Sequence, residues 1–199
     1  MSVISNNTLA GSSGQGGGAA GYAIDRSLRF NSGDSSNLSK TFASAGNRKT
    51  WTWSGWVKRS KFANQEFMLF GTPTSSNSFQ VYFASSTYGP QDTLKIGSDT
   101  GGVYRVSDAV FRDPSAWLHL VIVANTPDAT DSNRLRAWVN GVELTWSSSA
   151  SITQSSDLGW NSTSQHVIGA RGNPNLYFDG YLADVQFIDG QALTPSDFG

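Results

Sequence analysis

Carboxylates that could act as a catalytic pair are scarce in this sequence. Retaining glycosidases need two carboxyl groups about 5 Å apart. The chain has only two glutamates, Glu66 and Glu143, and neither has a second acid at an alternating position nearby. Asp179, Asp184 and Asp189 repeat every five residues, which on a strand turns Asp184 to the opposite face from the other two. These aspartates also lie among turn glycines, so we predict structural roles and no catalytic residue.

Nucleophilic and metal chemistry find little support either. The chain has no cysteine, and its two histidines, His119 and His166, have no acid at a ligand or triad spacing. We predict that His119, in an apolar run, is a buried and hydrogen-bonded structural residue. Asp128, Asp131 and Asn133 are close in sequence, but calcium needs six to eight oxygen ligands. Ordinary turn chemistry is the favoured interpretation, and we expect no metal and no cofactor.

Seven tryptophans are the remaining chemical feature. Exposed aromatic rings can stack on sugars or on a partner surface, whereas buried rings fill a core. Strand parity or loop setting makes Trp56, Trp138 and Trp160 candidates for an outward surface, with Arg136 as a polar companion of Trp138. A core role for these three remains the alternative. Three others are predicted to be core residues: Trp51, Trp53 and Trp117.

The elements that position these residues have the pattern of strands. Short apolar or alternating runs are separated by clusters of Gly, Asn, Ser, Asp and Pro. They occupy Ser27–Asn31, Thr50–Arg59, Phe67–Phe70, Phe79–Phe83, Leu94–Ile96, Val103–Val106, Trp117–Ala124, Leu135–Val139 and Val142–Trp146. Along the second run, alternation predicts that Trp51, Trp53 and Val57 face the core and that Trp56 faces outward. The run 117–124 is apolar throughout, which is typical of a central strand buried on both faces.

Turn and cap signals divide these strands. Asn140-Gly141 favours a type I′ hairpin turn, because both residues tolerate positive φ. Near the end, Thr194 is a candidate N-cap, followed by Pro195 at the first helical position and Asp197 at the third. The sequence therefore predicts a hairpin at 135–146 and the start of a capped helix at 194.

The first 22 residues differ from the rest in composition. They are rich in Ser, Asn and Gly, with only three sizeable apolar residues, Val3, Ile4 and Leu9. So little apolar area does not offset the entropy of ordering the segment. We expect residues 1–22 to form an arm whose apolar residues dock on a partner subunit. A linker held by its own domain, at residues 23–199, is the alternative.

Charge and hydropathy limit the partners. The net charge is −1 and only 15% of residues are charged, which disfavours binding to nucleic acid. There is no run of eighteen apolar residues for a membrane span and no basic, apolar start of a signal peptide. We expect a protein that folds in the cytoplasm and binds neither nucleic acid nor membrane.

Five motifs, taken in order, resemble a laminin-G-like (concanavalin A-like) jelly roll. They are Trp51-Thr-Trp-Ser-Gly-Trp-Val-Lys58, Trp117-Leu-His119, Trp138-Val-Asn-Gly-Val142, His166-Val-Ile-Gly169 and Phe178-Asp-Gly-Tyr-Leu-Ala-Asp-Val185. The resemblance covers residues 27–199 and implies an all-β, antiparallel jelly-roll sandwich preceded by the extended Gly-rich arm. Catalytic glucanases of this superfamily carry Glu-x-Asp-x-x-Glu on one strand, a motif that this chain lacks. The resemblance therefore implies no enzyme.

Three segments resemble virion proteins of tailed bacteriophages, especially those that infect cyanobacteria. They are Ser27-Leu-Arg-Phe-Asn31, the stretch from Gly46 to Arg59 and the closing stretch from Tyr177 to Gly199. This resemblance implies a non-enzymatic structural protein, such as a capsid decoration or cement, a head fibre or a tail-associated protein. It would be exposed on the particle, form homo-oligomers and contact other virion proteins through the arm. The alternative is a carbohydrate-binding adhesin that recognises a glycan of the host surface.

Overall fold

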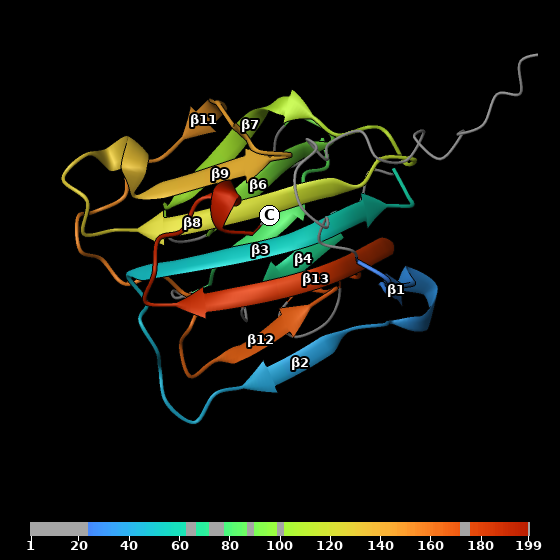
Figure 1. The fold of residues 1–199 in the computed structure, drawn as a ribbon, viewed down its shortest axis with the longest axis horizontal. Coiled ribbons are helices and arrows are strands. Elements are labelled where there is room, and N and C mark those ends of the chain that lie inside the picture. Colours follow the sequence, from blue (N-terminus) through green and yellow to red (C-terminus); the bar gives the residue numbers. More distant parts are fainter. Residues whose placement is uncertain are drawn as a thin grey trace, which may run out of the picture.

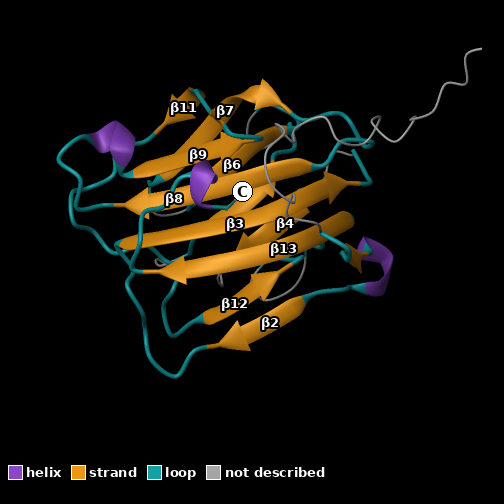
Figure 2. Cartoon of the chain, in the orientation of Figure 1, coloured by secondary structure: helices purple, strands orange, loops and turns teal. Residues whose placement is uncertain are grey.

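The computed structural model describes residues 24–62, 67–71, 78–86, 90–98, 102–171 and 176–198, without the side chains of Phe67 and Met68. Within these ranges the chain forms two antiparallel sheets stacked face to face (Figure 1), joined by loops and three short 3₁₀ turns (Figure 2). The all-β jelly-roll prediction is confirmed. The residues predicted to dock on a partner, Val3, Ile4 and Leu9, lie outside the described residues, and so does Glu66.

One sheet has six strands in the order β1-β13-β3-β8-β9-β10. Their bounds are β1 Leu28–Phe30, β3 Thr50–Arg59, β8 Leu118–Asn125, β9 Leu135–Val139, β10 Val142–Glu143 and β13 Gly180–Asp189. The other sheet has seven strands in the order β11-β7-β6-β5-β4-β12-β2. Their bounds are β2 Leu38–Thr41, β4 Phe67–Gly71, β5 Gln80–Phe83, β6 Thr93–Gly97, β7 Tyr104–Val110, β11 Trp146–Ser149 and β12 Gln165–Ile168.

The central strands follow the predicted alternation. On β3, Trp51, Trp53 and Val57 point into the core between the sheets and are almost fully buried, whereas Trp56 is on the outer face and only partly buried. Strand β8 is buried on both faces along 119–124, as its apolar run predicts. Leu120, Ile122 and Ala124 belong to the main core, while Val121 and Val123 form an outer cluster.

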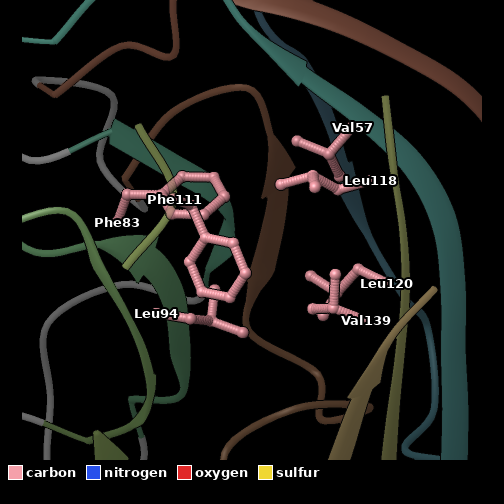
Figure 3. A pocket seen from close by; sticks show the side chains of 7 residues that line it. All are labelled: Val57, Phe83, Leu94, Phe111, Leu118, Leu120 and Val139. Carbon is pink, nitrogen blue, oxygen red and sulfur yellow. The ribbon is translucent and has the colours of Figure 1, made fainter. Parts of the chain in front are cut away.

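A narrow crevice lies in the core between the two sheets. The crevice is lined from one sheet by Val57, Leu118, Leu120 and Val139 and from the other sheet and its loops by Phe83, Leu94 and Phe111 (Figure 3). It has essentially no volume accessible to a water molecule. These apolar side chains hold the sheets together by burial, so the crevice is part of the core.

The predicted hairpin is confirmed. Asn140 and Gly141 both have positive φ, at 51° and 78°, and β9 pairs with β10 across them. The second strand of the hairpin is shorter than predicted. It ends at Glu143, and the chain then changes sheets, so that β11 pairs with β7 in the seven-stranded sheet.

Strand β13 depends on a glycine at its entry and on a bulge at its centre. A Cβ at Gly180 would come within 2.2 Å of the Lys58 carbonyl oxygen, so only glycine fits beside β3. The register shifts between Ala183 and Gln186, and Asp184 in the bulge has a φ of 46°. Asp179 and Asp189 do not form an acidic site. Asp179 accepts hydrogen bonds from Ser32, and Asp189 accepts them from the Asn47 backbone and the Asn161 amide.

After β13 the chain folds back over the outer face of the six-stranded sheet, as the C-terminal segment, residues 190–198 (Figure 1). The Thr52 hydroxyl donates to the Gln191 carbonyl at 2.8 Å and accepts from the Leu193 N–H at 2.9 Å. The predicted cap is confirmed: Thr194 and Asp197 form a capping box around a 3₁₀ turn, Pro195–Asp197. Phe198 packs against the outer cluster on β8 and β9.

No helix in the described part of the chain combines the length and the apolar character needed to cross a membrane.

Candidate functional site

A pocket opens on the outer face of the six-stranded sheet, where the C-terminal segment faces the loop between β8 and β9. Its volume is about 170 Å³. The sheet contributes its floor, the loop at 126–134 one wall, and the C-terminal segment the other. The lining residues are Val123, Asn125, Asp128, Asn133, Arg136, Trp138, Ala192, Leu193 and Thr194. The pocket therefore combines polar groups with an apolar wall.

Arg134 holds the loop wall in place. This nearly buried guanidinium donates to the carbonyls of Asp128, Ala129 and Ile152, at 2.8, 2.8 and 2.6 Å. Three backbone carbonyls from two segments are thus satisfied by one side chain. A loop fixed in this way keeps its side chains in one arrangement, which reduces the entropy lost on binding.

Asp131 ties the same loop to the seven-stranded sheet. Its carboxylate pairs with buried Arg105 of β7 at 3.2 Å and accepts from the Ile152 N–H at 2.7 Å. Desolvation would raise the pKa of Asp131. The Ile152 hydrogen bond and the charges of Arg105 and Arg134 outweigh it and hold the pKa below its usual range. Asp131 thus has a structural role, as its assignment to turn chemistry predicted. Asp131 is not among the residues that line the pocket.

The floor of the pocket is an arginine stacked on a tryptophan. The Arg136 guanidinium lies 4.6 Å from the centre of the Trp138 ring and forms a bidentate pair with Glu143, at 2.6 and 2.5 Å. The hydrogen bonds between them raise the pKa of Arg136 and lower that of Glu143. Trp138 is on the outer face with Arg136 as its companion, as predicted, but it is only 6% exposed and so offers little of its ring to a ligand.

The walls carry the polar groups that are free to bind. Asp128 Oδ1 accepts from the Thr130 N–H at 2.8 Å, whereas no described residue bonds to Oδ2. The side chain of Asn125 has no hydrogen bond to the described residues, and Asn133 makes one long contact to Asp128, at 3.4 Å. The Thr194 hydroxyl is engaged in its own cap. Asn125, Asp128 and Asn133 are therefore the groups that a ligand would meet.

The other predicted surface tryptophans differ in outcome. Trp160 is 5% exposed and packs edge-on against Phe70 and His166, at 4.3 and 4.4 Å between ring centres, so its prediction as a surface residue is wrong. Its loop passes through the core cluster instead of along the surface. Trp56 is half-buried on the outer face and stacks on His119 at 4.9 Å. Trp117, predicted as core, is also only half-buried.

Sequence reasoning missed part of the site. Asn125, Leu193 and Thr194 were not singled out, and Asp128 and Asn133 were assigned to turn chemistry. Asn125 shares its face of β8 with Val123, and alternation from the core residue Ala124 could have placed it on the outer face. No local sequence pattern predicts the C-terminal wall of the pocket, because this wall forms only when residues 192–194 fold back onto the sheet.

A contact between Ser54 and His119 does not form a catalytic triad with a described acid. Ser54 Oγ lies 2.9 Å from His119 Nε2, but the serine is 2% exposed and no described carboxylate is hydrogen-bonded to the histidine. Burial lowers the pKa of His119. His119 is thus buried and hydrogen-bonded as predicted, on the outer face of β8. No three His, Asp or Glu residues in the described ranges gather as metal ligands do.

Two stacked antiparallel sheets with this strand order define a jelly-roll sandwich. The laminin G model of the concanavalin A-like lectin/glucanases superfamily matches residues 15–197, and the chain belongs to this superfamily. No curated protein matches the chain.

Three solved structures illustrate the likeness of fold. Domain 4 of an extracellular arabinanase from Geobacillus stearothermophilus, in complex with arabinotriose, has a TM-score of 0.51 and 18% identity, over 75% of this chain and 65% of that one. A putative carbohydrate-binding protein from Bacteroides ovatus has a TM-score of 0.60 and 14% identity, over 86% of this chain and 45% of that one. Domains LG4-5 of the mouse laminin α1 chain have a TM-score of 0.55 and 12% identity, over 87% of this chain and 45% of that one. The chain thus spans less than two thirds of these three structures, and at such identities the likeness shows the fold alone.

Proposed function

We propose that this protein is a non-enzymatic carbohydrate-binding module and that the pocket beside the C-terminal segment holds one sugar unit. The observation that carries the proposal is the pocket itself, in which unengaged polar groups on an anchored loop face an apolar wall. Sugars present this combination of hydroxyl groups and C–H faces. The sugar complex and the putative carbohydrate-binding protein among the similar folds support the proposal.

The chemistry of the lining favours a neutral sugar. Asp128 Oδ2 accepts hydrogen bonds from sugar hydroxyls, and the amides of Asn125 and Asn133 both donate and accept. Leu193 contacts the apolar face of the ring. Arg136 is paired with Glu143 and also feels the charge of Asp128, so the pocket offers no unpaired cation to an anionic sugar.

The state of Glu143 supports a binding role without catalysis. A general acid in a glycosidase needs a raised pKa, whereas Arg136 lowers the pKa of Glu143 and occupies both of its oxygens. No second carboxylate among the described residues is hydrogen-bonded to it.

Asn125→Ala and Asp128→Asn are expected to weaken glycan binding at least tenfold each, about 1.4 kcal/mol or more. Asn125→Ala removes a group without internal bonds, and Asp128→Asn keeps an acceptor for the Thr130 N–H. Both variants should therefore fold normally. A broad glycan array identifies the ligand, and isothermal titration then gives its Kd. Asp157→Asn, which changes an exposed acid outside the pocket lining, is the control and should bind as tightly as the unmodified protein.

The proposal fails if no glycan on the array binds, or if the two pocket variants bind the ligand as tightly as the control.

We further propose that the module is a structural protein of a tailed-phage virion, where it forms homo-oligomers and is displayed outward. The support comes from the sequence: the phage-like segments near residues 27–31, 46–59 and 177–199, and the Gly-rich arm with Val3, Ile4 and Leu9. Deletion of residues 1–22 is then expected to reduce incorporation into particles at least tenfold, measured by quantitative mass spectrometry of purified virions. Unchanged incorporation would show that the arm does not dock.

A further inference from the structure

A second group of aromatic side chains lies on the same outer face, at the opposite end of β3 and β8 from the pocket. Pairing aligns Arg29 of β1 with Tyr181 of β13, and Tyr181 with Lys58 of β3. Trp117 immediately precedes β8, and the pairing of Val57 with Leu118 places it beside Lys58. One row across the sheet therefore reads Arg29, Tyr181, Lys58, Trp117. We call it the aromatic row.

The rings of this row are only partly buried. Trp117 and Tyr181 are each half-buried, with 6.4 Å between their ring centres. Trp56 occupies the next row, and it too is half-buried. Phe198 covers the neighbouring outer cluster on β8 and β9, and its ring centre lies 6.3 Å from that of His119. Three large rings thus remain accessible beyond the C-terminal segment.

Two cations, Arg29 and Lys58, flank these rings and form no ion pair with a described residue. The exposed Arg29 guanidinium lies 6.0 Å from the Tyr181 ring centre. The hydrogen bonds from Ser115, with a smaller contribution from the charge of Lys58, lower the pKa of Asp113, whose carboxylate forms no ion pair with Lys58. The amide of Gln186 engages the nearby Asp184.

Stacking surfaces and unpaired cations on one row suit a specific class of ligand. The C–H face of a pyranose ring packs on an aromatic ring, as other apolar groups do. A carboxylate or sulfate on the same chain provides the anion that Arg29 and Lys58 lack. The pocket has no such cation, because Arg136 is paired with Glu143, so the two ends of the sheet face favour different sugars.

We propose that the aromatic row is a second carbohydrate-contact surface, which stacks an acidic polysaccharide on Trp117 and Tyr181 and pairs its anionic groups with Arg29 and Lys58. This inference rests on the proposed function as a carbohydrate-binding module. It adds a separate surface, with a ligand class that the pocket disfavours.

The test compares three polymers with the full chain by affinity electrophoresis and titration. Polygalacturonate provides carboxylates, dextran sulfate provides sulfates, and dextran is the neutral reference. At least one anionic polymer is expected to bind at least tenfold more tightly than dextran, and the stronger of the two identifies the anionic group. Raising the salt concentration from 50 to 500 mM should weaken this binding several-fold, because exposed charges are screened.

Variants then locate the surface. Trp117→Ala and Arg29→Glu are each expected to weaken binding of the anionic polymer at least fivefold. Lys49→Glu makes a similar change of charge at the other end of β3 and serves as the control. Arg29 is exposed, so Arg29→Glu remains informative even if Trp117→Ala lowers stability.

The inference is overturned if the anionic polymers bind no better than dextran, or if both row variants bind as the control does. The pocket variants Asn125→Ala and Asp128→Asn should keep their binding to the anionic polymer. Failure of the row and failure of the pocket are therefore separate results.

Discussion

Asp92→Asn is expected to lower the free energy of unfolding by about 3 kcal/mol, because it leaves a buried arginine without its counter-charge. Arg59 at the end of β3 and Asp92 before β6 are 3% and 4% exposed, and their side chains are 2.9 Å apart. This ion pair connects the six-stranded sheet to the seven-stranded one. Burial lowers the pKa of Arg59, and the hydrogen bond and charge of Asp92 oppose that effect.

Among the described residues, Asp92 is the acid with which Arg59 forms an ion pair. Its guanidinium lies between the rings of Phe62 and Phe83, 4.4 and 4.3 Å from their centres, and otherwise donates to the Phe111 carbonyl. Asparagine keeps the size of Asp92 and tolerates its φ of 65°. The substitution therefore removes the charge while preserving the backbone.

Thermal and urea unfolding measure this effect. For a chain of this length, about 3 kcal/mol corresponds to a fall in Tm of roughly 6–12 °C. Asp157→Asn is the matched control, because it removes the charge of an exposed ion pair with Arg48, at 3.6 Å, and should change stability by less than about 1 kcal/mol. Equal losses in the two variants would contradict the assigned role of burial.

The parts of the fold that were predictable from sequence are those that local pattern determines. The alternation on β3 placed Trp51, Trp53 and Val57 in the core. The Asn140-Gly141 pair specified its turn through backbone conformation alone, since both residues have positive φ. Thr194 and Asp197 specified a cap by the same kind of local bonding.

Side-chain burial on the outer face was not predictable in this way. Parity correctly placed Trp138 on the outer face, but its exposure depends on Arg136 above it and on a C-terminal segment more than fifty residues later in the sequence. Trp160 had no strand parity to guide it, and its loop enters the core. Trp117 precedes β8 and remains half-buried beside Tyr181.

The candidate site likewise depends on contacts between segments that are distant in the sequence. Asp128 and Asn133 were visible in the sequence as loop residues, and Asp131 ties their loop to Ser151 and Ile152. A pocket appears only when residues 192–194 form its second wall. Tertiary packing therefore creates the binding surface. Whether binding depends on the anchored loop at 126–134 can be tested by mutation.

Arg134→Met is expected to lower the free energy of unfolding by about 2–3 kcal/mol and to weaken glycan binding in the pocket at least tenfold. Three carbonyls lose a charged donor, and hydrogen bonds of this kind contribute more than neutral ones. Methionine retains the apolar stem, so the change isolates the guanidinium. The binding loss arises because Asp128 and Asn133 are no longer held in one arrangement and must be ordered when the sugar binds.

Matched variants separate loop anchoring from charge. Arg134→Lys keeps the positive charge but cannot reach three carbonyls in a fixed fork, so we expect intermediate losses of both stability and affinity. Arg26→Met removes an exposed arginine outside the pocket lining and should change neither quantity. Melting curves and titration with the array ligand measure the two effects on the same samples. A destabilised Arg134→Met that binds its glycan with unchanged affinity would show that the pocket does not depend on the anchored loop.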